Sequence, residues 1–383
     1  MVPSGEVSGR SRRSLAAVDP NYYLYERYLP ANRRSRLLAA YYVLKRVLPR
    51  RLQLALRRAY ARRQKMVAFP AWPIEPVLVN HRYDLIRDEL RRTGASRIPL
   101  VNLWPHGSRF AFILTHDVEG PAGVANIPRV LEIERRHGFV ASYNFVAEDY
   151  PIDPDVFELV LAAGGEVGLH GIRHDPRLFQ SRENFEADLP NIHRYLRDWS
   201  AVGFRSPATH RRAEWMHELG CLYDSSFHDT APFEPQRGGS CSILPFHFGD
   251  VVELPITLVM DHTLFEILQD ESLDRWVDKS EWLIGHHGLI NLLTHPDYLL
   301  SEERLDLYDR FLAFLACQRE GWHALPREVA EWWNTRKALS CEPTEDGSTR
   351  IAGGPAEGAT VAWASEVGGE VVFDTRVPSA VGW

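Results

Sequence analysis

Cysteine is scarce in this sequence of 383 residues, which contains only Cys221, Cys241, Cys317 and Cys341. No two of them are close enough to form a CxxC pair, so the paired thiolates of common structural zinc sites are excluded. Four cysteines in a chain of this length also do not indicate a disulfide framework. We therefore expect reduced thiols.

Long apolar runs are missing as well. No segment reaches the roughly 20 uncharged apolar residues that a membrane-spanning helix needs, and the first twenty residues lack the apolar core of an export signal. A phosphate-binding glycine loop and nucleic-acid-binding motifs are also absent, so neither a nucleotide nor a nucleic-acid partner is predicted. The sequence therefore predicts a cytoplasmic protein.

Charge is unevenly distributed along the chain. The formal net charge is −7, yet residues 1–66 hold 16 Lys and Arg and only three acids, about +13, which leaves about −20 for the remainder. Residues 32–65 have helical periodicity, and Pro49 divides them into two helices; 81–93 is a further helix. We interpret the pair either as a helical hairpin packed on the main domain or as a basic amphipathic arm that contacts an anionic membrane or another polyanion.

From residue 109 onward, short β-type runs alternate with helical patterns. Strands separated by helices are typical of parallel β/α units, and seven such strands favour a barrel over an open sheet. The predicted strands are 109–114, 141–146, 166–169, 203–205, 221–224, 251–255 and 289–293. The predicted helices are 127–137, 155–163, 182–198, 211–219, 271–284, 302–317 and 326–333.

The predicted fold class is α/β: a distorted (β/α)7-type barrel with an N-terminal helical extension and a short C-terminal β-like tail. We expect the basic extension over residues 1–95, the barrel over 96–338 and the tail over 339–383. Residues 360–364 and 371–373 in the tail are predicted to form one β-hairpin, with the rest of the tail partly disordered.

Polar residues follow five of the predicted strands. In a β/α barrel the chemistry lies where strands end and loops begin, so these segments are expected to meet at one mouth. The Asp-x-Glu pair of the first segment needs a compensating cation, and histidines four residues apart can present two imidazoles to one metal. The five segments read THDVEG (115–120), HGIRH (170–174), FRSPA (204–208), YDSS (223–226) and LLTHP (292–296).

This ordered set resembles the five motifs of the polysaccharide deacetylase family, also called the NodB-homology or carbohydrate esterase family 4 group, in the branch whose first motif reads Asp-x-Asp. The resemblance covers residues 109–333. It implies a divalent metal, Zn²⁺ first with Co²⁺, Mn²⁺ or Ni²⁺ as alternatives, held by Glu119, His170 and His174. Glu119 stands where the family has Asp, and Ala208 stands where many members have an aromatic residue.

The resemblance also implies catalytic roles. Asp117 matches the general base that activates water, and Arg205 matches the arginine that holds this base ionised. His295 matches the general acid for the leaving amine, and Asp224 is interpreted as the acidic partner that raises the pKa of His295. The loop after Pro207 matches the segment whose backbone N–H helps to bind the oxyanion.

The function predicted from these residues is metal-dependent hydrolysis of a non-peptide C–N bond, N-deacetylation of a sugar or glycoconjugate. One alternative keeps the metal but replaces the sugar with a small amide or a cyclic ureide. Another is a barrel that binds glycan without cleaving it. The sequence does not indicate an oligomeric state.

Overall fold

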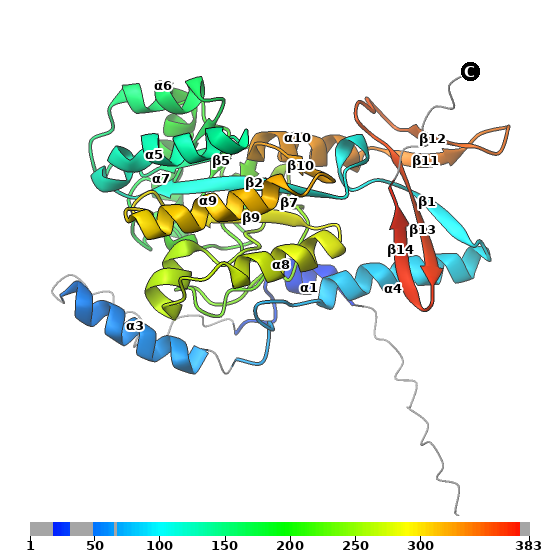
Figure 1. The fold of residues 1–383 in the computed structure, drawn as a ribbon, viewed down its shortest axis with the longest axis horizontal. Coiled ribbons are helices and arrows are strands. Elements are labelled where there is room, and N and C mark those ends of the chain that lie inside the picture. The colour runs from blue at the N-terminus through cyan, green and yellow to red at the C-terminus, as the bar shows by residue number, and fades with distance from the viewer. Residues whose placement is uncertain (1–17, 31–48, 65–66, 376–383) are drawn as a thin grey trace, which may run out of the picture.

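The computed structural model describes residues 18–30, 49–64 and 67–375. Its centre is a nine-stranded sheet that curls into a distorted barrel (Figure 1). All seven predicted strands are present and run parallel, which confirms the predicted fold class. They are β2 (Phe110–Val118), β3 (Ser142–Phe145), β4 (Glu166–Leu169), β5 (Gly203–Phe204), β6 (Tyr223–Asp224), β8 (Val251–Glu253) and β9 (Leu289–Thr294).

The strand order follows the chain for most of the sheet. From β9 it runs through β2, β3, β4, β5 and β6 to β8, where β7 (Phe246–Phe248) adds an antiparallel edge. A parallel strand, β10 (Gly321–His323), pairs with the first residues of β2. The segment after β8 lies beside β9, because the backbone N–H groups of Thr257 and Leu258 donate to Asn291 O at 3.3 and 3.2 Å. These bonds draw the two ends of the sheet together.

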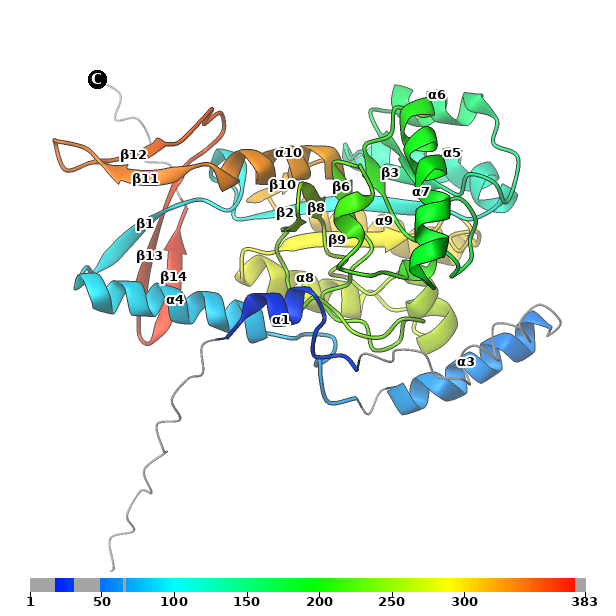
Figure 2. The same cartoon turned by 180° about the vertical axis from the view of Figure 1, so that it is seen from behind.

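Helices cover the outside of the sheet (Figure 2). They are α5 (Pro121–His137), α6 (Pro154–Ala162), α7 (Arg182–Asp198), α8 (Asp274–Gly285), α9 (Glu302–Ala316) and α10 (Pro326–Lys337). Proline lies in the first turn of α5, α6 and α10, and the side chains of Ser181 and Ser301 cap α7 and α9. Every residue of β2 is buried, as expected for a parallel strand covered on both faces.

One predicted helix does not form. Residues 211–219 contain only the short 3₁₀ turn η3 (Met216–Glu218), which follows the 3₁₀ turn η2 (Pro207–Thr209). The backbone of Arg211 is used elsewhere: its N–H donates to Gln236 Oε1 at 3.1 Å, and its carbonyl accepts from Gln236 Nε2 at 3.0 Å. A tertiary contact therefore replaces the first helical turn.

The N-terminal extension contributes three described helices, α1 (Pro20–Leu24), α3 (Arg50–Gln64) and α4 (Val77–Thr93). The second helix predicted around Pro49 is α3, whereas residues 32–48 lie outside the described residues. Ala61 of α3 is buried with Phe233 and with Ile267 of the π-helix η4 (His262–Leu268). One face of α3 is therefore packed on the loops of the barrel.

A second, smaller sheet joins the C-terminal tail to the strand that precedes the barrel. The predicted tail hairpin is present as β13 (Val361–Val367) and β14 (Glu370–Asp374), and β11 (Ser340–Pro343) forms a further hairpin with β12 (Thr349–Ala352). The sequence did not predict that β13 also pairs with β1 (Arg97–Val101), with Ile98 opposite Ala364.

Within the described ranges, no helix is long and apolar enough to cross a bilayer.

Candidate active site

Except for Asp224, the residues predicted from the strand ends meet at one mouth of the barrel. Asp117 lies near the end of β2 with Glu119 just beyond it, His170 follows β4, Arg205 follows β5 and His295 follows β9. Because these strands are neighbours and parallel, their carboxyl ends share one edge of the sheet.

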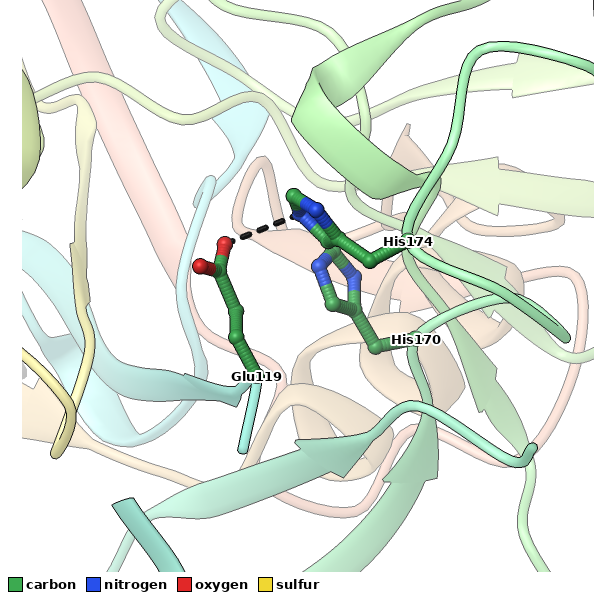
Figure 3. A group of neighbouring side chains, drawn as sticks. All are labelled: Glu119, His170 and His174. Atoms are coloured by element: carbon green, nitrogen blue, oxygen red, sulfur yellow. Dashed lines mark ion pairs between the residues drawn. The ribbon is translucent and has the colours of Figure 1, made fainter. Parts of the chain in front are cut away.

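Glu119, His170 and His174 form a group that could hold a metal ion. One ligand atom from each lies within 4.8 Å of the others, and Figure 3 shows the three side chains pointing toward one another. His174 Nε2 lies 2.9 Å from Glu119 Oε1. The loop after β4 brings His174 back toward His170, so that their ring centroids are 5.3 Å apart. These are the three residues that the sequence predicted as ligands.

The environment of His170 fits a metal ligand. Its Nδ1 contacts Arg205 O at 3.2 Å, while its buried Nε2 has no hydrogen-bond partner within the described part of the chain. A hydrogen bond at Nδ1 leaves the lone pair of Nε2 for a cation, which is the usual arrangement of a ligating histidine. Burial lowers the pKa of His170 to about 4, so its imidazole is neutral at pH 7.

Glu119 is held as an anion beside these histidines. Burial alone would raise the pKa of its carboxyl, but His174 and His295 outweigh burial and the pKa lies well below its usual value. Its backbone N–H donates to Asp297 Oδ2 at 2.9 Å, which fixes the start of the loop after β2. Asp is usual at this position in the motif that the sequence resembles. The longer side chain of Glu119 reaches both imidazoles.

Asp117 is buried and held by three neighbours. Arg205 Nη1 lies 3.3 Å from Asp117 Oδ1, Asn144 Nδ2 donates to the same oxygen at 3.0 Å, and His170 Nδ1 lies 3.6 Å from Oδ2. Burial raises the pKa of Asp117, but His170, Arg205 and His295 together lower it below its usual value. These contacts hold the Asp117 side chain as a carboxylate anion.

His295 also lies beside Glu119, with its Nε2 3.6 Å from Glu119 Oε1. Its Nδ1 lies 2.6 Å from Asp261 Oδ1, and its backbone N–H donates to Asp261 Oδ2 at 2.7 Å. Burial alone would lower the pKa of His295, but Asp261 and Glu119 raise it to about 10. His295 is therefore a protonated imidazole at neutral pH.

The carboxylate beside His295 is thus Asp261 and not Asp224, the residue named from the sequence. The side chain of Asp224 accepts hydrogen bonds from Ser226 N at 3.1 Å and Ser226 Oγ at 2.7 Å. It also lies against the buried Glu253, and burial raises the pKa of Asp224. The described contacts of Asp224 are therefore with Ser226 and with Glu253 of β8.

Two contacting residues were missed by sequence reasoning. Asp261 is the N-cap residue of η4 and precedes His262. Asn144 lies within β3, opposite Asp117 in the ladder. The signal available for Asn144 was its place, as a polar residue, within a predicted strand; the sequence held no comparable signal for Asp261.

No family model and no curated protein matches the chain, but solved structures resemble it. A protein described as a polysaccharide deacetylase from Mycobacterium smegmatis is 20% identical with a TM-score of 0.50, over 61% of this chain and 93% of that one. The PuuE allantoinase is 17% identical (TM-score 0.48; 60% and 92% covered). A protein described as a polysaccharide deacetylase from Pseudomonas aeruginosa PAO1 is also 17% identical (TM-score 0.46; 60% and 93% covered). At 20% identity, the likeness to the Mycobacterium smegmatis protein shows that this chain shares its fold.

Proposed function

We propose that this protein is a divalent-metal-dependent hydrolase that removes an acyl group from an amide nitrogen on a sugar or glycoconjugate, as polysaccharide deacetylases do. The observation that carries the proposal is the convergence of Glu119, His170 and His174 beside the buried carboxylate of Asp117 and the buried imidazolium of His295. The shared fold and the five motifs support the same reaction class.

The proposal of a divalent metal rests on the three side chains that could bind it. Two imidazole nitrogens and one carboxylate leave coordination positions open, which is typical of catalytic Zn²⁺ and also suits Co²⁺, Mn²⁺ or Ni²⁺. A divalent cation held there supplies Lewis acidity, which polarises a carbonyl oxygen and lowers the pKa of a water molecule.

Asp117 and His295, which contact members of this trio, supply the proton transfers. Asp117, held ionised by Arg205 and Asn144, takes a proton from the attacking water. The water oxygen forms a bond to the acyl carbon. His295, protonated because of Asp261, gives its proton to the nitrogen as the C–N bond breaks. The products are a carboxylic acid and a free amine.

The experiment measures acetate release from N-acetylated sugars by the purified protein loaded with each of the four metals. We expect Asp117→Asn to lower kcat by roughly 100-fold to 10,000-fold while metal content is retained, because only the base is lost. His170→Ala is expected to lose both activity and metal. His217→Ala, whose side chain is 53% exposed, is the matched histidine control.

Each of the other possible outcomes would change a residue assignment or favour a different function. Near wild-type turnover in Asp117→Asn would refute the base assignment. Turnover of cyclic amides without acetate release would favour a small-molecule amidohydrolase. Glycan binding with no hydrolysis of any substrate would favour the non-catalytic barrel.

For location we propose the cytoplasm, with α3 at an anionic membrane surface. The four cysteines are free thiols, as in a reducing compartment. The arginines of α3 supply positive charge, and its outer face carries exposed apolar side chains.

A further inference from the structure

Glu26, in the N-terminal extension, is a fully buried carboxylate near the mouth of the barrel. Arg211 Nη2 donates to Glu26 Oε1 at 2.5 Å and Arg211 Nε donates to Oε2 at 3.2 Å, so the pair is bidentate. Neither residue has exposed surface. A buried charge is strongly unfavourable without its partner, so each side chain fixes the position of the other.

Arg211 carries this restraint to the turn that follows β5. Its Nη1 donates to Thr209 O at 2.9 Å. Ala208 and Thr209 have positive φ angles, 50° and 52°, which non-glycine residues adopt at a cost and keep only where their surroundings impose it. The hydrogen bond from Arg211 is one such restraint on η2.

The same turn touches the loop that carries the histidines. A Cβ atom on Gly171, the residue after His170, would lie 2.6 Å from Pro207 Cδ, so Pro207 packs directly on this loop. Arg205, two residues before Pro207, contacts Asp117. A shift of η2 would therefore also displace the loop that carries the histidines and the arginine that contacts Asp117.

Glu26 also holds a second segment of the mouth. The N–H of Gly239 donates to Glu26 Oε1 at 2.7 Å, and Tyr28 Oη donates to Gly239 O at 2.6 Å. Gly238 has φ 134°, and a Cβ there would lie 2.4 Å from Glu26 Oε1. The carboxylate thus joins the turn after β5 to the loop between β6 and β7.

We propose that Glu26 is a positioning residue for the reaction: through Arg211 it holds the Ala208–Thr209 turn where the backbone N–H of Ala208 can meet the oxyanion formed at the acyl carbon. This inference rests on the proposed function. It makes the N-terminal extension part of the active site, although that segment lies outside the region that resembles the deacetylase motifs.

The test is Glu26→Gln in the full chain, which keeps the side-chain shape and removes the charge. We expect kcat for acetate release to fall about 10-fold to 100-fold, the range expected for a misplaced reacting group, with KM and metal content close to wild type. The matched control is Glu166→Gln, which removes the charge of another buried carboxylate, at the start of β4, whose partner Arg327 is 35% exposed. Both substitutions should lower thermal stability, because each removes the charge of a buried carboxylate. Only Glu26→Gln should also lower kcat.

A second readout does not depend on activity. Hydrogen exchange of the amides in residues 206–212 should become faster in Glu26→Gln and remain unchanged in Glu166→Gln. If the wild type hydrolyses no amide, the proposed function fails, and exchange alone decides whether Glu26 holds the turn. Unchanged exchange at 206–212, or equal losses of kcat in the two variants, would overturn the inference.

Discussion

At the scale of single residues, buried charges around the mouth are compensated in pairs. Asp117 contacts Arg205, His295 contacts Asp261 and Glu26 contacts Arg211. Removing one partner leaves the other charge buried, which costs more than the lost contact itself. Substitutions in these pairs should therefore alter protonation and geometry together.

Asp261→Asn should shift the pH dependence of the proposed reaction. Burial lowers the pKa of His295 and Asp261 is the largest cause of its rise to about 10, so without this anion the pKa falls. The imidazolium is then lost at lower pH, and the alkaline limb of the kcat profile should move down by one pH unit or more. The profile with N-acetylated substrate measures this. An unmoved limb would mean that His295 is not the acid.

Glu253→Gln should reduce the loss of stability at higher pH. Burial and the neighbouring Asp224 raise the pKa of Glu253 well above its usual value. The folded state then binds a proton that the unfolded state has released, so the unfolding free energy falls as pH rises above the ordinary pKa of Glu. Gln can still accept from Phe227 N, which lies 3.0 Å from Glu253 Oε1.

Urea unfolding at pH 5 and pH 8 measures this effect. We expect the decline between these two values to be smaller in Glu253→Gln by about 1 kcal/mol or more, since one pKa unit corresponds to about 1.4 kcal/mol. Glu357→Gln, at an exposed position, is the control. Equal declines in wild type and Glu253→Gln would contradict the raised pKa.

At the scale of elements, α3 has two different faces. Its inner face is fixed to the barrel loops, since Ala61 is buried there and Arg58 Nε donates to Glu266 O at 2.7 Å. Its outer face carries Leu52, Leu56 and Tyr60, spaced four residues apart and 42–46% exposed. Both interpretations from the sequence therefore remain compatible with this helix: it packs on the main domain and still presents a basic, apolar face.

Leu52→Ser/Leu56→Ser should weaken binding to vesicles that contain phosphatidylserine. Removing two leucines from a lipid-facing surface should lower partitioning by roughly 10-fold at low salt. The matched control is Leu159→Ser/Leu161→Ser, which changes two exposed leucines of α6. Equal partitioning of the two double variants in a co-sedimentation assay would leave α3 with a packing role alone.

At the scale of the whole molecule, the second sheet ties the tail to the chain before the barrel. β13 pairs with β1, and Phe373 of β14 lies 4.9 Å from the His287 ring and 6.2 Å from the Tyr83 ring, measured between centroids. Tyr83 belongs to α4, and His287 precedes β9. These contacts lead us to propose that the tail unfolds together with the barrel.

Phe373→Ala should destabilise the whole protein by roughly 1–2 kcal/mol, because apolar surface shared by the tail, α4 and the barrel is lost. Urea unfolding followed by tryptophan fluorescence should remain a single transition with a lower midpoint. Val372→Ala, at a position that is 45% exposed, should have little effect. Two separate transitions would show instead that the tail is an independent unit.

The sequence by itself determined the barrel and the group of residues that we propose as metal ligands. The strands are local apolar runs between helical patterns, and Asp117, Glu119, His170, His174 and His295 each lie at or just beyond the end of such a run. Parallel strands bring their carboxyl ends to one edge, so local pattern was sufficient to bring these residues together.

Only the tertiary structure decided the residues that support them. Asp261 and Asn144 contact residues 34 and 27 positions away, and Glu26 contacts Arg211 across 185 positions. No periodicity in the sequence around Asp261, Asn144 or Glu26 indicates which residue each of them contacts. Tertiary contacts also replaced the helix predicted over 211–219 and paired β13 with β1. The physical reason is that local propensity specifies where a strand or helix forms, whereas the partner of a buried charge or an edge strand depends on the packing of distant segments.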